Sequence, residues 1–137
     1  MLKDKYTLFG YKKETIGIKE PYLTRRILYI FGFTLRYHVF HTSDNDDYLH
    51  DHPWWFITFP IDKYYEDIGT EKGHWCQSRV VRPFRFHFRK AKFSHRVFIP
   101  QGQKQIRTII FTGRVSNNWG FWKDGKHHYW KDWFGYD

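Results

Sequence analysis

Alanine and methionine are nearly absent from this chain of 137 residues, whereas 23% of its residues are aromatic. Alanine and methionine favour helices, while aromatic residues pack well on the pleated surface of a sheet. The composition therefore predicts an all-β protein. A chain of this length forms one domain and buries about two-thirds of the surface that its unfolded form exposes. We expect a single domain over residues 1–137.

Long apolar runs are also missing. No run reaches the roughly 18 residues that a transmembrane helix needs, and the first residues, Met1 to Lys5, lack the apolar centre of a signal peptide. We therefore expect a cytoplasmic protein without a membrane-spanning segment. Cysteine occurs once, as Cys76, which excludes an internal disulfide. In a reducing compartment Cys76 is expected to be a buried or half-buried strand residue and not a catalytic thiol.

Acidic residues are scarce relative to basic ones. The chain has 14 acidic residues against 23 lysines and arginines, which gives a formal charge of +9. A basic surface attracts anions over a long range, so the charge favours a nucleic acid, a nucleotide or a phosphorylated metabolite as partner. The same charge is also typical of a small protein whose basic residues only face water.

Residues 49–60 contain the motif around which the rest of the chain is organised. His50 and His52 are two residues apart, so in an extended backbone they point to the same side, while Asp51 points away. Pro53 belongs at the start of a strand, which places both histidines at the mouth of the sheet that follows. Mouths of β-barrels are common ligand sites. The pair predicts a metal site, although a chain with nine histidines also produces such pairs by composition.

A second histidine-bearing block follows downstream. Strand-like segments cover residues 79–89 and 95–99, and the second of them begins with His95. Two β-rich blocks, the first opening with the histidine pair and the second with a lone histidine, resemble the double-stranded β-helix of the cupin superfamily. This resemblance implies a jelly-roll-like barrel in which His50, His52 and His95 converge on one divalent metal.

The sequence also resembles a narrower family, the small cupin-like proteins common in phage and bacterial genomes. The strings that carry this resemblance are His50-Asp51-His52-Pro53-Trp54, His95-Arg96, Thr112-Gly113 and Trp119-Gly120-Phe121. It covers residues 23–134. It implies an N-terminal extension over residues 1–22, a barrel over residues 23–122 and an aromatic tail over residues 123–137 that packs on the barrel.

One position departs from the usual cupin pattern. The glutamate expected four or five residues after the second histidine is replaced by Phe56 and Ile57. The metal set is therefore expected to contain three histidines without a carboxylate, which is similar to cysteine-dioxygenase-type cupins. Neutral imidazoles suit iron, zinc, nickel and copper. The resemblance favours Fe(II) as the cofactor, with zinc, manganese or nickel as alternatives.

Other polar side chains could complete the site. In the segment 34–41, Arg36 and His38 share one face, and the sequence does not say whether that face is the barrel interior. If it is, His38 would contact substrate as a catalytic group, and Arg36 would bind an anionic ligand through its planar fork of donors. Arg96 is a second candidate for catalysis and anion binding. Glu66 could return toward the metal as a base or ligand, although it is also an ordinary residue for a strand end.

Residues 84–89 alternate phenylalanine with basic side chains. The period of two sends the three phenylalanines to one face and the basic residues to the other, a basic ridge formed by Arg85, His87 and Arg89. Arginines beside aromatic rings can hold phosphates and stack bases, as in proteins that bind single strands. The same alternation is typical of any half-buried strand.

The two ends of the chain carry further signals. Residues 6–9 and 15–18 are expected to form a short hairpin joined by the charged residues 12–14. The dipeptide Asp124-Gly125 predicts a hairpin turn within the aromatic tail. Four aromatic residues are expected in the core or the barrel wall: Trp54, Phe56, Phe111 and Trp119.

Three classes of function follow from these features. The first is a metal-dependent cupin enzyme that acts on a small anionic molecule bearing a carboxylate or phosphate, with dioxygenase-like chemistry if the metal is Fe(II). The second is a non-catalytic barrel that captures a nucleotide or sugar phosphate, such as a phage-encoded ligand sponge. The third is a nucleic-acid-binding module, favoured by charge alone. A homodimer is compatible with each class. A polar concave interior would favour the first two classes. Basic and aromatic residues on an outer face would favour the third.

Overall fold

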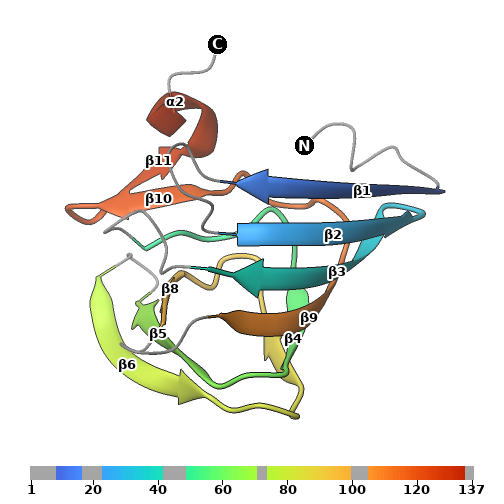
Figure 1. Ribbon diagram of the computed structural model, residues 1–137. Helices are drawn as coiled ribbons and strands as arrows, with labels where there is room; N and C mark the ends of the chain where they lie inside the picture. Colours follow the sequence, from blue (N-terminus) through green and yellow to red (C-terminus); the bar gives the residue numbers. More distant parts are fainter. Residues whose placement is uncertain (1–8, 17–22, 42–48, 71–73, 100–104, 135–137) are drawn as a thin grey trace.

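The computed structural model describes residues 9–16, 23–41, 49–70, 74–99 and 105–134, most of them in strands (Figure 1). The elements in chain order are β1 (Phe9–Ile16), β2 (Leu23–Ile30), β3 (Phe33–Phe40), β4 (Phe56–Pro60), β5 (Tyr64–Gly69), β6 (Trp75–Val81), β7 (His87–Arg89), β8 (His95–Phe98), β9 (Ile106–Thr112), β10 (Gly120–Lys123), β11 (Lys126–Tyr129) and α2 (Trp130–Phe134). Within these residues, no helix is long and apolar enough to cross a membrane.

Two antiparallel sheets and a hairpin make up the fold. The larger sheet has the strand order β1-β2-β3-β9-β4-β7, and the smaller sheet has the order β6-β5-β8. Strands β10 and β11 pair with each other. Figure 1 shows the two sheets curving toward each other. Because β9 lies between β3 and β4, the chain interleaves its early and late segments in one barrel. This arrangement confirms the predicted all-β barrel.

Strand β3 shows which face of the larger sheet forms the interior. Arg36, His38 and Phe40 are buried, whereas Leu35 is 43% exposed. Strand β9, which pairs with β3, alternates in the same way. The face that the sequence left undecided is therefore the inner one. Six of the buried apolar residues form one cluster: Leu23, Phe40, Tyr64, Val81, Val97 and Ile106.

The predicted N-terminal hairpin is wrong over the part of it that the structure describes. Residues 12–14 do not form a turn, because they lie inside the single strand β1, which pairs with β2 along its whole length. Every second residue of this strand is exposed, so charged side chains reach water without leaving the sheet. Glu14 also pairs with Arg25 on β2, which favours the observed register. Residues 1–8 and 17–22, which hold the rest of the predicted hairpin, lie outside the described residues.

The hairpin turn predicted at Asp124-Gly125 is confirmed between β10 and β11. The two residues have φ angles of 54° and 73°, the left-handed conformation that a two-residue type I′ turn requires.

Asp51 is buried and connects this hairpin to the histidine motif. Its Oδ1 accepts a hydrogen bond from the backbone N–H of Gly120 (2.7 Å) and lies 3.2 Å from Nε2 of His127. The aromatic tail therefore packs beside the two histidines.

The aromatic residues expected in the core or wall divide into three groups. Phe56 is buried, and Trp54 and Trp119 are half-buried. Phe111 is a wall residue and not a core residue, because the alternation of β9 turns it outward and leaves it 37% exposed. Cys76 is a strand residue, as expected, but it is exposed and not buried, because almost the whole of β6 is exposed to solvent.

Replacing Trp119 by alanine should lower the free energy of unfolding by about 2 kcal/mol, less than for a fully buried ring. Its indole stacks on Trp130 of α2, with 5.9 Å between ring centroids, and contacts Phe121 at 5.7 Å. Urea unfolding measures the loss, with Phe86→Ala as the control because the Phe86 ring is 79% exposed. A Trp119→Ala variant as stable as the parent would contradict a structural role for the tail.

Candidate metal centre

Three histidines meet where the segment before β4 crosses the start of β8. His50 and His95 exchange two backbone hydrogen bonds, of 3.0 Å and 2.9 Å, and the N–H of His52 donates to the carbonyl of Ala91 at 2.9 Å. These bonds hold the first histidine block against the second. The ring centroids lie 5.2 Å apart for His50 and His52, 5.0 Å for His50 and His95, and 4.8 Å for His52 and His95.

The three imidazoles form a cluster of potential metal ligands. One ring nitrogen from each of His50, His52 and His95 lies within 4.8 Å of the others. His95 is buried, whereas His50 and His52 are half-buried. Within the described part of the chain, no carboxylate or cysteine belongs to this group. The sequence singled out the same three histidines, and the structure brings them together.

Glu66 lies behind His95 and orients its ring. The carboxylate, on β5, is 1% exposed, and its Oε2 lies 2.8 Å from Nδ1 of His95. This contact occupies Nδ1, so Nε2 is the nitrogen of His95 that is available to a metal ion. Metal-binding histidines commonly use one ring nitrogen in this way, because a carboxylate on the other fixes the tautomer and the ring direction.

His95 and Arg89 hold the Glu66 carboxylate in its ionised form, and Arg79 is a third hydrogen-bond partner. Oε1 of Glu66 accepts hydrogen bonds from Nη2 of Arg89 (2.9 Å) and from Nε of Arg79 (3.1 Å). Burial opposes ionisation, but the hydrogen bond and charge of His95 and the charge of Arg89 outweigh it and lower the pKa of Glu66 to about 2. Glu66 is therefore a poor proton acceptor at neutral pH. Glu66 also lies outside the cluster of ligand atoms. The sequence had suggested it as a base or a metal ligand.

His52 is prepared to act as a neutral ligand. Burial, followed by the charges of His95 and His50, lowers its pKa well below the usual value of 6.5. Its Nδ1 atom is buried and has no hydrogen-bond partner among the described residues. A buried polar atom without a partner costs free energy, so an unpaired nitrogen beside two other imidazoles fits a position that a metal ion completes.

Arg36 lies on the inner face of β3 and reaches the cluster through an aromatic ring. Its side chain is 3% exposed, and its Nε donates to Oγ1 of Thr34 at 2.8 Å. Its guanidinium lies 4.7 Å from the ring centre of Trp54, which in turn stacks on His52 at 5.8 Å. The cation–π contact restrains the guanidinium in a partly dehydrated environment. The predicted anion-binding residue is therefore inside the barrel, and the Trp54 ring links it to the predicted metal ligand His52.

His38 is also inside the barrel, one inward position further along β3. Burial, followed by the charges of Arg36 and Arg25, lowers the pKa of His38 well below 6.5, so the ring is neutral at neutral pH. Neither ring nitrogen has a hydrogen-bond partner among the described residues. The ring therefore offers one donor and one acceptor to a molecule bound inside the barrel.

Sequence reasoning missed the threonines that make the interior polar. The buried members of this set are Thr34, Thr58, Thr108 and Thr112. The hydroxyls of Thr58 and Thr108 are hydrogen-bonded at 2.7 Å, and those of Thr34 and Thr112 are paired as well. The period of two that relates Thr34 to Arg36 was a signal for its inward position. The pairing across strands had no signal in the sequence.

Arg96 does not join the histidines. It follows His95 directly on β8, so its side chain points to the opposite face of the strand, where its Nε lies 3.5 Å from Oδ2 of Asp67. The alternation that brings His95 into the barrel is what turns Arg96 away from it. The structure therefore places one of the two arginines predicted for anion binding in the interior, and this residue is Arg36.

The predicted basic ridge is wrong. Only His87, Phe88 and Arg89 form a strand, and the three phenylalanines of the segment face water while Arg89 turns inward to Glu66. The buried Glu66 carboxylate is stabilised by a cationic partner. Arg89 fills this role, so the face of β7 that carries Arg89 points to the interior. Arg85 lies in the preceding turn and is exposed.

Comparison with known proteins gives likeness in structure only. No known family model matches the sequence, and no curated protein sequence matches it. Fe(II)-HppE with the alternative substrate (S)-1-HPP is similar with a TM-score of 0.60 and 11% identity, over 75% of this chain and 56% of that chain. The hydroxypropylphosphonic acid epoxidase from S. wedmorenis, in complex with fosfomycin, has a TM-score of 0.55 and 12% identity, over 67% and 51%. A cupin-2 domain protein from Rhodospirillum rubrum has a TM-score of 0.56 and 13% identity, over 79% and 73%.

The barrel and its histidine cluster together define the class of this protein, a cupin fold with a three-histidine cluster suited to a metal ion. At 11–13% identity the likeness shows the fold alone. The chain spans 51–56% of the length of the HppE and epoxidase chains that it matches. The narrower resemblance to small cupin-like proteins of phage and bacterial genomes stays a prediction.

Proposed function

We propose that this protein is a metal-dependent cupin enzyme that holds one divalent transition metal through His50, His52 and His95 and binds a small anionic molecule beside it. One observation carries this proposal: three imidazoles from two separate segments place a ligand atom each within 4.8 Å of one another, and the Trp54 ring links one of them to a buried arginine. Neutral imidazoles are the usual ligands of iron, zinc and nickel.

The donor set fits such an ion. Imidazole nitrogens that share a metal at about 2.1 Å lie about 3–4 Å apart, so modest ring rotations would complete the site. Glu66 acts as a positioning residue, because it directs Nε2 of His95 toward the other two rings. When bound, a metal with three protein ligands supplies a Lewis acid or a redox centre with open positions.

Fe(II) is the first choice of metal, with zinc, manganese and nickel as alternatives. The nitrogen-only donor set supports a transition metal over magnesium or calcium, which prefer oxygen ligands. The likeness of the fold to Fe(II)-HppE supports iron. A dioxygenase-like reaction would follow from iron, whereas zinc would favour hydrolysis or isomerisation.

The residues of the barrel determine what the site binds. Arg36 presents a planar fork of donors to a carboxylate, phosphate or phosphonate, and Trp54 holds that fork in place. His38 donates to or accepts from a second polar group of the same molecule, because its ring nitrogens are otherwise unpartnered among the described residues. The paired hydroxyls of Thr58 and Thr108 add further polar contacts. The HppE neighbour is described with (S)-1-HPP as its alternative substrate, which is consistent with a small ligand.

A thermal-shift screen of small carboxylates, phosphates and phosphonates, with and without Fe(II), Zn(II) and Mn(II), tests the proposal. Stabilisation by an anion only when metal is present supports the enzyme. Stabilisation by nucleotides or sugar phosphates without metal would instead support the non-catalytic binder, whose polar interior is the same. A cytoplasmic location and a homodimer remain predictions from the sequence.

Arg36→Gln should weaken binding of the anion found in that screen by about 10- to 100-fold, because it removes a charged hydrogen-bonding partner. Metal content should remain at the level of the parent, since Arg36 is not a ligand. Isothermal titration of parent and variant gives the comparison. Arg26→Gln is the matched control, because Arg26 lies on β2 and donates to Tyr11 on the outer edge of the sheet. Equal anion affinity in Arg36→Gln and the parent would remove Arg36 from the site.

A further inference from the structure

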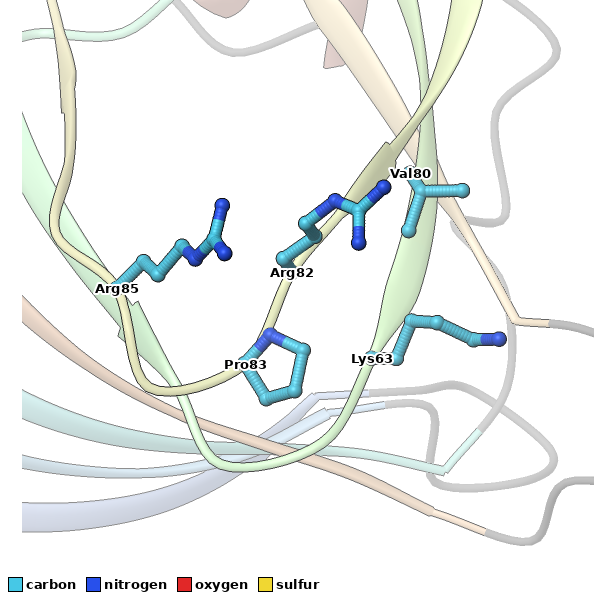
Figure 2. Close-up of a pocket in the computed structure, with 5 residues that line it drawn as sticks. All are labelled: Lys63, Val80, Arg82, Pro83 and Arg85. Atoms are coloured by element: carbon cyan, nitrogen blue, oxygen red, sulfur yellow. The ribbon is translucent and has the colours of Figure 1, made fainter.

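A second candidate binding site lies at the turn between β6 and β7. A cavity of about 380 Å³ opens there, lined by Lys63, Val80, Arg82, Pro83 and Arg85. Figure 2 shows Arg82 and Arg85 extending from the two sides of Pro83, with the Lys63 side chain on a neighbouring segment. None of these residues belongs to the histidine cluster. We call the segment of residues 82–88 the basic aromatic turn.

The two arginines of this turn differ from the other arginines of the chain. Neither the Arg82 nor the Arg85 guanidinium has an acidic or carbonyl partner among the described residues. Each of the remaining arginines interacts with a carboxylate, a hydroxyl or a carbonyl oxygen, as is the case for Arg25, Arg26, Arg36, Arg79, Arg89, Arg96, Arg107 and Arg114. From Lys72 to Lys123 the sequence contains no aspartate or glutamate. The positive charge of the turn is therefore not neutralised along its own stretch of chain.

Three phenylalanine rings of the same turn face water. Phe84 is 67% exposed, Phe86 is 79% exposed and Phe88 is 57% exposed. Soluble proteins seldom expose several large aromatic rings next to one another unless the surface contacts a partner. The ion pair between Arg89 and Glu66 turns the opposite face of β7 inward and leaves these rings in water, where a partner can reach them.

The turn is held in shape by the barrel. Phe84 has a φ angle of 58°, a strained conformation for a bulky residue. Its N–H donates to the carbonyl of Pro60 (2.9 Å), and Nε2 of His87 lies 3.0 Å from the carbonyl of Arg82. Phe59 of β4 contacts the rings of Phe84 (6.2 Å) and Phe86 (5.0 Å). The rings and guanidinium groups are thus displayed on a defined backbone.

We propose that the basic aromatic turn binds single-stranded nucleic acid. Arg82 and Arg85 contact neighbouring phosphates, because a guanidinium matches the geometry of a phosphate. Phe84 and Phe86 stack on unpaired bases, a contact that any base can make. A duplex presents its phosphates to the arginines but keeps its bases stacked inside, so it cannot contact the phenylalanine rings. This site is independent of the metal centre and of the proposed function.

Fluorescence anisotropy with a labelled oligonucleotide of about 12 nucleotides, in excess EDTA and over a range of salt concentrations, tests the proposal on the full chain. Arg82→Gln combined with Arg85→Gln should weaken binding about tenfold and reduce the slope of log affinity against log salt by about 1.4, or about 0.7 for each phosphate that is no longer neutralised. Phe86→Leu should weaken binding about tenfold while leaving that slope unchanged, because stacking releases no counterions. Arg26→Gln removes a positive charge elsewhere and should bind like the parent, apart from a small general decrease.

Circular dichroism confirms that each variant is folded. Equal affinity for a duplex of the same length would overturn the proposal, because paired bases cannot stack on the rings. Equal weakening in Arg26→Gln and in the double arginine variant would overturn it too, since it would show attraction by net charge alone. Competition by a mononucleotide at the concentration of the oligonucleotide, or binding of anionic vesicles that ignores Phe86→Leu, would assign the surface to another ligand and overturn the proposal as well.

Discussion

A variant with both His50 and His52 replaced by alanine should retain almost no transition metal, whereas the parent should bind about one ion per chain. The double replacement leaves His95 as the one ligand of the cluster. A single imidazole does not displace enough water from a divalent ion to hold it through purification, because affinity depends on several donors acting together. Elemental analysis of protein purified without chelator and without a histidine tag measures the loss.

His74→Ala is the matched control for this experiment. His74 is exposed and lies outside the cluster, so its removal should leave the metal content unchanged. Metal content equal to that of the parent in the double variant would refute the assignment of the site. A parallel loss in His74→Ala would show that the metal binds to histidines in general and not at this centre.

Glu66→Ala should lower the free energy of unfolding of the metal-free protein by about 3–5 kcal/mol. The carboxylate is 1% exposed and is shared by His95, Arg89 and Arg79. Alanine would leave the guanidinium of Arg89, whose side chain is 11% exposed, without its anionic partner in a poorly hydrated environment. Removing one member of a buried charge pair is costly because the other stays charged. Urea unfolding in EDTA measures this effect apart from any stabilisation by metal.

The same variant should bind metal about 10- to 100-fold more weakly, because the direction of the His95 ring is no longer fixed. Asp67→Ala is the control, since Asp67 is the neighbouring acid on β5 and pairs with Arg96 at the surface. Its loss should lower the free energy of unfolding by only about 1 kcal/mol, because the Asp67–Arg96 pair is still partly open to solvent. A loss of metal affinity in Asp67→Ala as large as that in Glu66→Ala would contradict the positioning role that we assign to Glu66.

Local patterns accounted for the parts of the fold that depend on neighbours in the chain. The aromatic composition predicted an all-β protein, and the dipeptide Asp124-Gly125 predicted a turn that requires positive φ angles. The same reasoning failed for residues 12–14, where charged side chains suggested a turn. They lie within the edge strand β1, because the backbone of β1 pairs with β2 and alternate side chains of β1 face solvent.

The sequence by itself determined that His50 and His52 share a face, because alternation depends on nothing beyond an extended backbone. The tertiary structure decided which faces meet. Alternation defines two faces for β3 but not which of them is inside. The face of Arg36 and His38 is the inner one because Phe40, which shares it, packs in one buried cluster with residues of the smaller sheet. Glu66 and His95 are 29 residues apart in sequence and became partners only because β5 pairs with β8. The charge on Glu66 then drew Arg89 inward and left its phenylalanine neighbours in water, since a buried carboxylate requires a cation and an exposed ring costs less than an unpaired buried charge.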